Sequence, residues 1–134
     1  MPKSGPLSSE PKITVPKAAA PTTLVKKDII VGTGAVAASG DELTVDYVGA
    51  LYKNGSIFDA SWSHGGPKGV PFQFQLGVGS VIPGWDDGLV GMRVGGRREL
   101  IIPPSLAYKS TAQAKIPANS TLIFIVDLLG VAKG

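Results

Sequence analysis

The first candidate for catalysis is the chain's only histidine, His64. A histidine can serve as general base for a serine nucleophile, but it then needs an orienting carboxylate and a correctly placed hydroxyl. His64 lies between Ser63 and Gly65 in a glycine-rich stretch, and no nucleophile-elbow sequence can be assigned to it. We interpret it as an exposed loop residue, so nucleophilic catalysis lacks support.

Metal sites and paired carboxylates are the next chemistries to consider. The chain has no cysteine and one histidine, so it lacks the residues from which metal sites are usually built. Acidic pairs occur at Asp41-Glu42 and Asp86-Asp87, but neighbouring residues do not face each other on a helix. A glycosidase needs two carboxylates opposed across a sugar. We interpret these pairs as solvated surface groups, and we expect neither a metal nor a cofactor.

Aromatic residues form the remaining candidate set. Taken alone, the aromatic residues of a domain this size usually fill its core. They are spread through every segment of the domain, so the sequence around each one has to distinguish core filling from a pocket. The set consists of Tyr47, Phe58, Phe72, Phe74, Trp85, Tyr108 and Phe124.

Short motifs surround these aromatic residues in a fixed order. The motifs are Val45–Gly49, Gly55–Ser61, Pro71–Gly77, Val81–Leu89, Met92–Gly95, Leu100–Pro103, Ala107-Tyr108, Ile116-Pro117 and Leu122–Phe124. In this order and spacing, they resemble the FKBP family of peptidyl-prolyl isomerases. The resemblance extends from Leu24 to Val131.

The resemblance implies an α+β fold, with a curved antiparallel β-sheet wrapped around one short α-helix and a hydrophobic pocket between them. Trp85 would form the pocket floor, and the backbone N–H of Ile82 and the hydroxyl of Tyr108 would donate hydrogen bonds to ligand carbonyls. The implied catalytic residues are Tyr47, Asp59, Ile82, Trp85, Tyr108 and Phe124, and the implied substrate-binding residues are Phe58, Phe72, Val81 and Ile116.

The activity implied by the resemblance is rotation about X–Pro bonds in proline-containing peptides and unfolded proteins. It needs no covalent step, in agreement with the missing nucleophile, because an apolar pocket favours the twisted, less polar amide over the planar one. The same pocket would accept FK506- or rapamycin-like macrolides. Asp59 has two interpretations: it tunes the pocket electrostatically, or it satisfies a buried hydroxyl such as that of Tyr47.

Two departures from the family pattern concern the rim of this pocket. Lys109 stands where a glycine is usual after Tyr108, and Ser110 to Lys115 lacks the usual glycines and aromatic residues. This loop overhangs the pocket in the family, so the departure bears on the alignment of Ile116. Ser80 replaces a larger polar or acidic residue of many relatives, which would weaken contacts to macrolides.

Two alternative functions remain open. In the first, the chain is a binding module that works as a chaperone or recruits partners with little turnover. In the second, Val15-Pro16 or Ala20-Pro21 docks in the pocket of a neighbouring molecule, as the abundance of proline before residue 22 suggests.

The elements that would position these residues follow from apolar runs separated by glycine, which are typical of a sheet protein. Pro83 suits the first position of a helix with Ile82 as its cap and Gly91 as its stop. Lys53-Asn54-Gly55 predicts a tight hairpin with positive φ values. The predicted strands are Leu24–Val31, Leu43–Tyr52, Ser56–Phe58, Phe72–Leu76, Arg97–Ile102 and Leu122–Leu129.

Composition bounds the domain organisation and the partners. A chain of 134 residues suits one folded domain, and we predict a disordered Pro/Lys-rich tail over 1–23 and an isomerase domain over 24–134. Residues 1–27 carry five lysines against one glutamate, whereas the rest carries eight basic side chains against nine acidic ones. The folded part is therefore nearly neutral, and no nucleic-acid partner is expected. With no apolar run long enough for a bilayer and no signal-peptide core, we expect a cytoplasmic monomer without a membrane partner.

Overall fold

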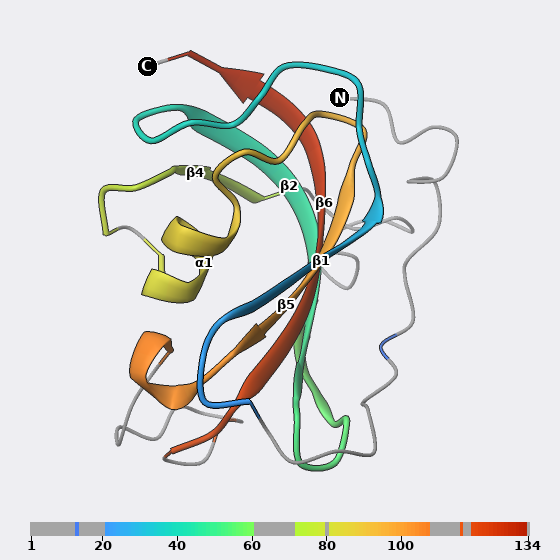
Figure 1. Ribbon diagram of the computed structural model, residues 1–134, viewed down its shortest axis with the longest axis vertical. Coiled ribbons are helices and arrows are strands. Elements are labelled where there is room, and N and C mark those ends of the chain that lie inside the picture. The colour runs from blue at the N-terminus through green and yellow to red at the C-terminus, as the bar shows by residue number, and fades with distance from the viewer. Residues whose placement is uncertain are drawn as a thin grey trace.

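The structure is a computed structural model, and it describes residues 13, 21–60, 72–79, 81–107, 116 and 119–133. Within these residues a twisted sheet carries one α-helix on one side (Figure 1). The elements are β1 (Val25–Ile30), β2 (Glu42–Leu51), β3 (Ile57–Ala60), β4 (Phe72–Gln75), α1 (Pro83–Gly88), β5 (Arg97–Ile102), the 3₁₀-helix η3 (Pro104–Leu106) and β6 (Leu122–Ala132). The strand order is β1-β5-β6-β2-β3, with β4 also paired to β2, and every pair is antiparallel. The predicted α+β fold is confirmed.

The element boundaries agree with the sequence to within a few residues, and the hairpin after β2 is the main difference. Of Lys53, Asn54 and Gly55, only Gly55 has a positive φ, of 73°, so the predicted tight hairpin with positive φ values at Asn-Gly was wrong. The loop is longer than two residues: the N–H of Gly55 donates to the carbonyl of Leu51, and that of Ser56 donates to the Asn54 side chain. Asn54 therefore contributes its side-chain oxygen rather than a left-handed backbone.

Two glycines seat α1 directly on β5. A Cβ added to Gly84 would lie 2.5 Å from Cγ2 of Ile102, and one added to Gly88 would lie 2.8 Å from Cδ2 of Leu100. Any larger residue would push the helix away from the sheet. The helix ends at Gly88, with Leu89 as its cap, three residues before the predicted stop at Gly91. This close approach brings the next side chain, Trp85, into the concave side of the sheet.

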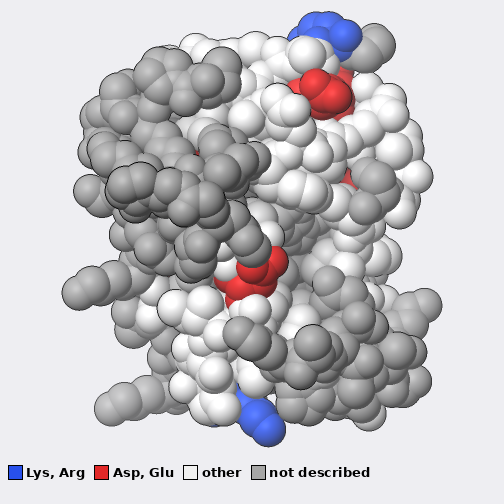
Figure 2. All heavy atoms as spheres, turned by 180° about the vertical axis from the view of Figure 1, so that it is seen from behind, with Lys and Arg blue, Asp and Glu red and all other residues white. Residues whose placement is uncertain are grey.

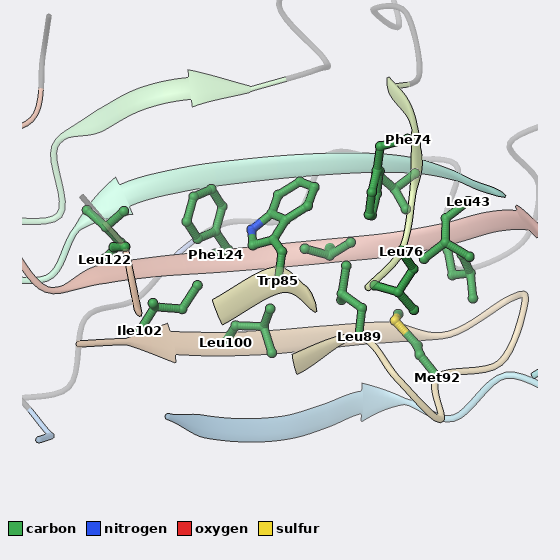
Figure 3. Packing of buried hydrophobic residues seen from close by; sticks show 14 of the residues in the cluster. Leu43, Phe74, Leu76, Trp85, Leu89, Met92, Leu100, Ile102, Leu122 and Phe124 are labelled. Carbon is green, nitrogen blue, oxygen red and sulfur yellow. The ribbon is translucent and has the colours of Figure 1, made fainter. Parts of the chain in front are cut away.

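The long β2–β6 ladder sets which side chains share that concave side. Tyr47 pairs with Val126, and Gly49 pairs with Phe124. Side chains alternate between the two faces of a strand, and those of Leu122, Phe124, Val126 and Leu128 in β6 belong to the main core. Figure 3 shows Phe124 and Leu122 of β6 on the same side as Trp85 of α1.

The opposite face of the sheet is buried as well. Ala50 and Ile123 are 0 % exposed, although they point away from α1, and Ile13 packs against the cluster that they form. Asp127 of β6 is also fully buried on this face, where the Nε and Nη2 atoms of Arg97 donate to its two oxygens at 2.7 and 2.9 Å. The described residues do not test the predicted division at residue 24, but Ile13 belongs to the packing of the folded part.

Glu99 makes the stability of the fold depend on pH. Burial raises the pKa of Glu99 above its ordinary value of 4.5, although the charge of Lys27, its partner across β1 and β5, lowers it. The folded chain therefore binds the carboxyl proton of Glu99 more tightly than the unfolded chain does. As pH rises above 4.5, Glu99 consequently lowers the free energy of unfolding. We expect Glu99→Gln to raise the free energy of unfolding at pH 7, with a gain that shrinks and disappears as pH falls below 4.5.

Urea unfolding at several pH values measures this difference. Replacing Lys27 with methionine removes the attraction that favours the charged form, so the gain from Glu99→Gln should be larger in that background. A gain that is the same at all pH values would show that titration of Glu99 is not its cause.

Candidate active site

A cavity of about 240 Å³ lies between α1 and the concave side of the sheet. Its lining comes from four strands, from α1 and from the segment before α1, so residues remote in sequence meet there. The cavity is smaller than the roughly 300–1,000 Å³ that is typical for drug-sized ligands, which suits a single ring or side chain. The lining residues are Tyr47, Phe58, Asp59, Phe72, Val81, Ile82, Trp85 and Phe124.

Trp85 is the central ring of this cavity. Its ring centroid lies 5.3 Å from that of Tyr47 and 5.3 Å from that of Phe124, with interplanar angles of 77° and 83°. Such edge-to-face contacts fix the orientation of all three rings. In Figure 3 the indole rises from α1 over the sheet, with its nitrogen on the side of Phe124. That nitrogen, Nε1, is buried and has no hydrogen-bond partner among the described residues.

A glycine in β2 makes room for a second aromatic contact. Phe58 and Phe124 meet edge to face, with ring centroids 5.5 Å apart. A Cβ on Gly49 would lie 2.6 Å from Cε2 of Phe124 and 2.7 Å from Cζ of Phe58. In the sequence Gly49 is only the end of a motif, because its place between Phe58 of β3 and Phe124 of β6 depends on the pairing of three strands.

Among the described lining residues, Asp59 supplies the only carboxylate. Its Oδ2 accepts a hydrogen bond of 2.5 Å from the hydroxyl of Tyr47, and its Oδ1 accepts one of 2.9 Å from the N–H of Ala60. The hydrogen bond from Tyr47 is the contact expected if Asp59 serves to satisfy a buried hydroxyl. The position in the cavity wall is what electrostatic tuning requires.

Ile82 presents a backbone donor at the rim. Its carbonyl accepts from the N–H groups of Trp85 and Asp86 at 2.9 and 3.3 Å, which begins α1. Among the described residues, its own N–H makes no hydrogen bond. A ligand carbonyl could therefore accept from this group without breaking a bond within the described structure.

Of the predicted site, one residue is absent from the described lining and another lies outside the described residues. Ile116 is 6 % exposed and packs in the main core. Tyr108 lies outside the described residues, as do His64, Ser80 and the stretch 109–115. Eight of the ten residues singled out in the sequence thus line one cavity.

The described residues offer little for other kinds of chemistry. No group of His, Cys, Asp and Glu among them is arranged to hold a metal ion. On the face seen in Figure 2, the described basic atoms lie at the upper and lower ends, and acidic atoms lie beside the upper basic atoms and near the middle. The described part of this face shows no basic stripe of the kind that is typical of nucleic-acid binders. Within the described part, no helix is long and apolar enough to cross a membrane.

The site thus combines an aromatic cavity, a carboxylate and a backbone N–H that makes no hydrogen bond among the described residues. An antiparallel sheet around a short helix carries these groups. Together they suit an apolar ring that lies next to a carbonyl. A family model described as FKBP-type peptidyl-prolyl cis-trans isomerase matches residues 34–129. The chain belongs to this family, and its activity is that of a peptidyl-prolyl cis/trans isomerase.

Individual relatives agree with this assignment. An "FK506-binding protein" of Streptomyces anulatus is 48 % identical over 124 residues, which cover 91 % of this chain and 97 % of that protein. A "Peptidyl-prolyl cis-trans isomerase FKBP14" of Pongo abelii is 47 % identical over 95 residues, or 71 % of this chain and 44 % of that protein. Among solved structures, AtFKBP13 superposes with a TM-score of 0.73 at 39 % identity, covering 84 % of this chain and 96 % of that chain.

Proposed function

We propose that this isomerase acts on proline-containing peptides and unfolded proteins by holding the prolyl ring in the aromatic cavity. The observation that carries the proposal is the cavity itself: aromatic side chains from β2, β3, β4, α1 and β6 enclose a space that suits one ring. Trp85 is the floor on which that ring rests, and Phe72 and Phe124 are walls. The described lining of the cavity includes no serine, threonine, cysteine or lysine, and the rotation needs no covalent step.

The apolar character of the cavity is the source of catalysis in this proposal. Rotation about a peptide bond meets a barrier of about 18–20 kcal/mol because it breaks amide resonance. In the twisted state the carbonyl loses charge separation, which water would otherwise stabilise. Walls that exclude water favour the twisted over the planar amide, and a difference of about 5–8 kcal/mol corresponds to roughly 10⁴- to 10⁶-fold acceleration.

The unused N–H of Ile82 orients the substrate. Rotation moves the carbonyl that precedes the proline, so a fixed donor acts best on a carbonyl that stays in place, such as the proline's own. We therefore assign the Ile82 N–H to the proline carbonyl. A second donor, the hydroxyl of Tyr108, is proposed from the family motif Ala107-Tyr108 alone.

The same cavity is proposed to accept FK506- or rapamycin-like macrolides. The name "FK506-binding protein" of the Streptomyces anulatus relative supports this ligand class. A macrolide would place one ring in the 240 Å³ cavity and the rest of its body against the exposed ring of Phe72, which is 40 % exposed. A role in protein folding as a cytoplasmic monomer remains a prediction.

Cis/trans exchange of a short X–Pro peptide, followed by NMR without any protease, tests the proposed function. We expect the chain to speed the exchange and FK506 to abolish that acceleration. Saturable peptide binding without faster exchange would instead support the binding module. Acceleration that FK506 leaves untouched would contradict a shared cavity.

Asp59 gives a prediction about the wall of this cavity. Asp59→Leu leaves the Tyr47 hydroxyl without its acceptor, and we expect kcat/KM to fall on the order of tenfold, the effect of losing about 1.4 kcal/mol of transition-state stabilisation. Asp59→Asn keeps an acceptor for the hydroxyl but removes the charge. An equal fall in both variants would assign the role to the charge, whereas near wild-type activity of Asp59→Asn would assign it to the hydrogen bond.

Tyr47→Phe is the matched control, because it removes the hydroxyl and leaves the carboxylate in place. Unchanged catalysis and unchanged macrolide affinity in Asp59→Leu would remove this residue from the mechanism.

A further inference from the structure

The segment that joins β4 to α1 carries three parts of the proposed site. Val81 and the N–H of Ile82 lie at the rim, and Trp85 follows within the first turn of α1. The segment begins with a turn in which Gly77 and Gly79 have φ values of 83° and 78°, a backbone conformation that glycine adopts readily. Val78 between them is 55 % exposed and belongs to no strand or helix. Gly77 packs closely against Ser39, but nothing lies within 4 Å of the Cβ position of Gly79, so the end of the turn nearer the rim has little packing of its own.

One carboxylate ties the turn back to the helix. Oδ1 of Asp86 accepts a hydrogen bond of 2.7 Å from the N–H of Gly77, and Oδ2 accepts one of 3.0 Å from the N–H of Gly79. Hydrogen bonds from backbone N–H groups to a charged carboxylate are stronger than neutral ones. The backbone N–H of Asp86 in turn donates to the carbonyl of Ile82. Asp86 is therefore bonded to both ends of the segment 77–82, which contains the rim residues Val81 and Ile82.

The neighbouring Asp87 makes none of these contacts. It is exposed, and no hydrogen bond or ion pair of its side chain occurs among the described residues. The two residues share charge, helix and side-chain type, so they differ mainly in whether the carboxylate is bonded to the turn.

We propose that Asp86 is a positioning residue for the isomerase reaction, holding the turn at Gly77 and Gly79 so that the N–H of Ile82 points at the substrate. This inference rests on the proposed function, because it concerns the donor assigned there to the proline carbonyl. Asp86 itself does not touch the reacting amide. Its effect passes through the direction of one backbone N–H group, and therefore through the affinity for the substrate.

The test compares Asp86→Ala with Asp87→Ala in the protease-free exchange assay. The Ile82 donor binds a carbonyl that does not rotate, so it holds the planar and twisted states equally and its loss appears mainly in KM. We expect KM to rise on the order of tenfold in Asp86→Ala with kcat within about twofold, and Asp87→Ala to match the wild type. Asp86→Glu, which keeps two carboxylate oxygens, should restore part of the lost affinity.

Two further readouts separate positioning from a purely structural role. In ¹H–¹⁵N spectra, Asp86→Ala should shift the amide signals of Gly77, Gly79 and Ile82, whereas Asp87→Ala should leave them in place. A lower melting temperature with unchanged KM would overturn the inference, as would equal effects of the two alanine variants. An inactive wild type would instead overturn the proposed function, so the two failures are distinguishable.

Discussion

Replacing Phe124 with alanine is expected to lower kcat/KM on X–Pro peptides by about 10²-fold or more, because it opens the wall of the cavity to water. The ring of Phe124 contacts those of Trp85, Phe58 and Tyr47, with centroids 5.3, 5.5 and 6.5 Å away. Its removal leaves three rings without a common neighbour and admits water to the place where the amide twists. The fall should appear in kcat, because the lost environment favours the twisted state over the planar one.

This variant also loses stability, so its control has to match that loss. Truncating a buried phenylalanine costs about 3–5 kcal/mol, and truncating a buried isoleucine costs about 2–5 kcal/mol. Ile125 is 2 % exposed and follows Phe124 in β6, but it points to the opposite face of the sheet. Ile125→Ala should therefore lose stability and keep its activity at a temperature where both variants are folded. Folded Phe124→Ala with wild-type kcat would contradict the proposed mechanism.

Replacing Asp127 with leucine is expected to lower the free energy of unfolding by about 3–5 kcal/mol, because it removes the buried carboxylate that binds the guanidinium of Arg97 through two hydrogen bonds. Asp127 is 0 % exposed, and the side chain of Arg97 is only 12 % exposed. Two parallel hydrogen bonds join them across β5 and β6. The pair lies on the face away from the cavity, so the variant should keep kcat/KM wherever it is folded.

The double variant Arg97→Met with Asp127→Leu tests whether the loss comes from breaking this pair. Replacing both members of a buried ion pair by apolar groups of similar size is often nearly neutral. Urea unfolding should therefore show that the double variant is more stable than Asp127→Leu alone. If the stability losses of the single variants Arg97→Met and Asp127→Leu simply add in the double variant, the two side chains do not stabilise the fold as a pair.

The sequence predicted the fold and the members of the cavity well where local pattern and motif agree. The strand Arg97–Ile102 was predicted with its observed bounds, because it is apolar at one end and bounded by glycines and a proline. Trp85 and Phe124 were assigned to one site from the motifs around them, and they lie in contact. Local patterns could not show that Gly49 leaves room for two rings, since that depends on the register between β2, β3 and β6.

The buried outer face is what the sequence analysis missed. In β6, Ile123, Ile125 and Asp127 alternate with the residues of the main core and are buried on the opposite face. The continuous run Leu122–Val126 was the available signal, since strands covered on both faces lack polar alternation. The role of Asp86 was missed for another reason. An acidic residue in the first turn of a helix has a sufficient explanation in the helix dipole, and only the position of the preceding turn reveals its second role.

The most direct test of the mechanism compares two ligands of equal size, a prolyl amide that is planar and an analogue whose amide is held twisted. Calorimetry should show that the twisted analogue binds at least about 10²-fold more tightly, and that this preference falls sharply in Phe124→Ala. Equal affinity of the two ligands for the wild-type chain would contradict the claim that the cavity selects the rotated amide.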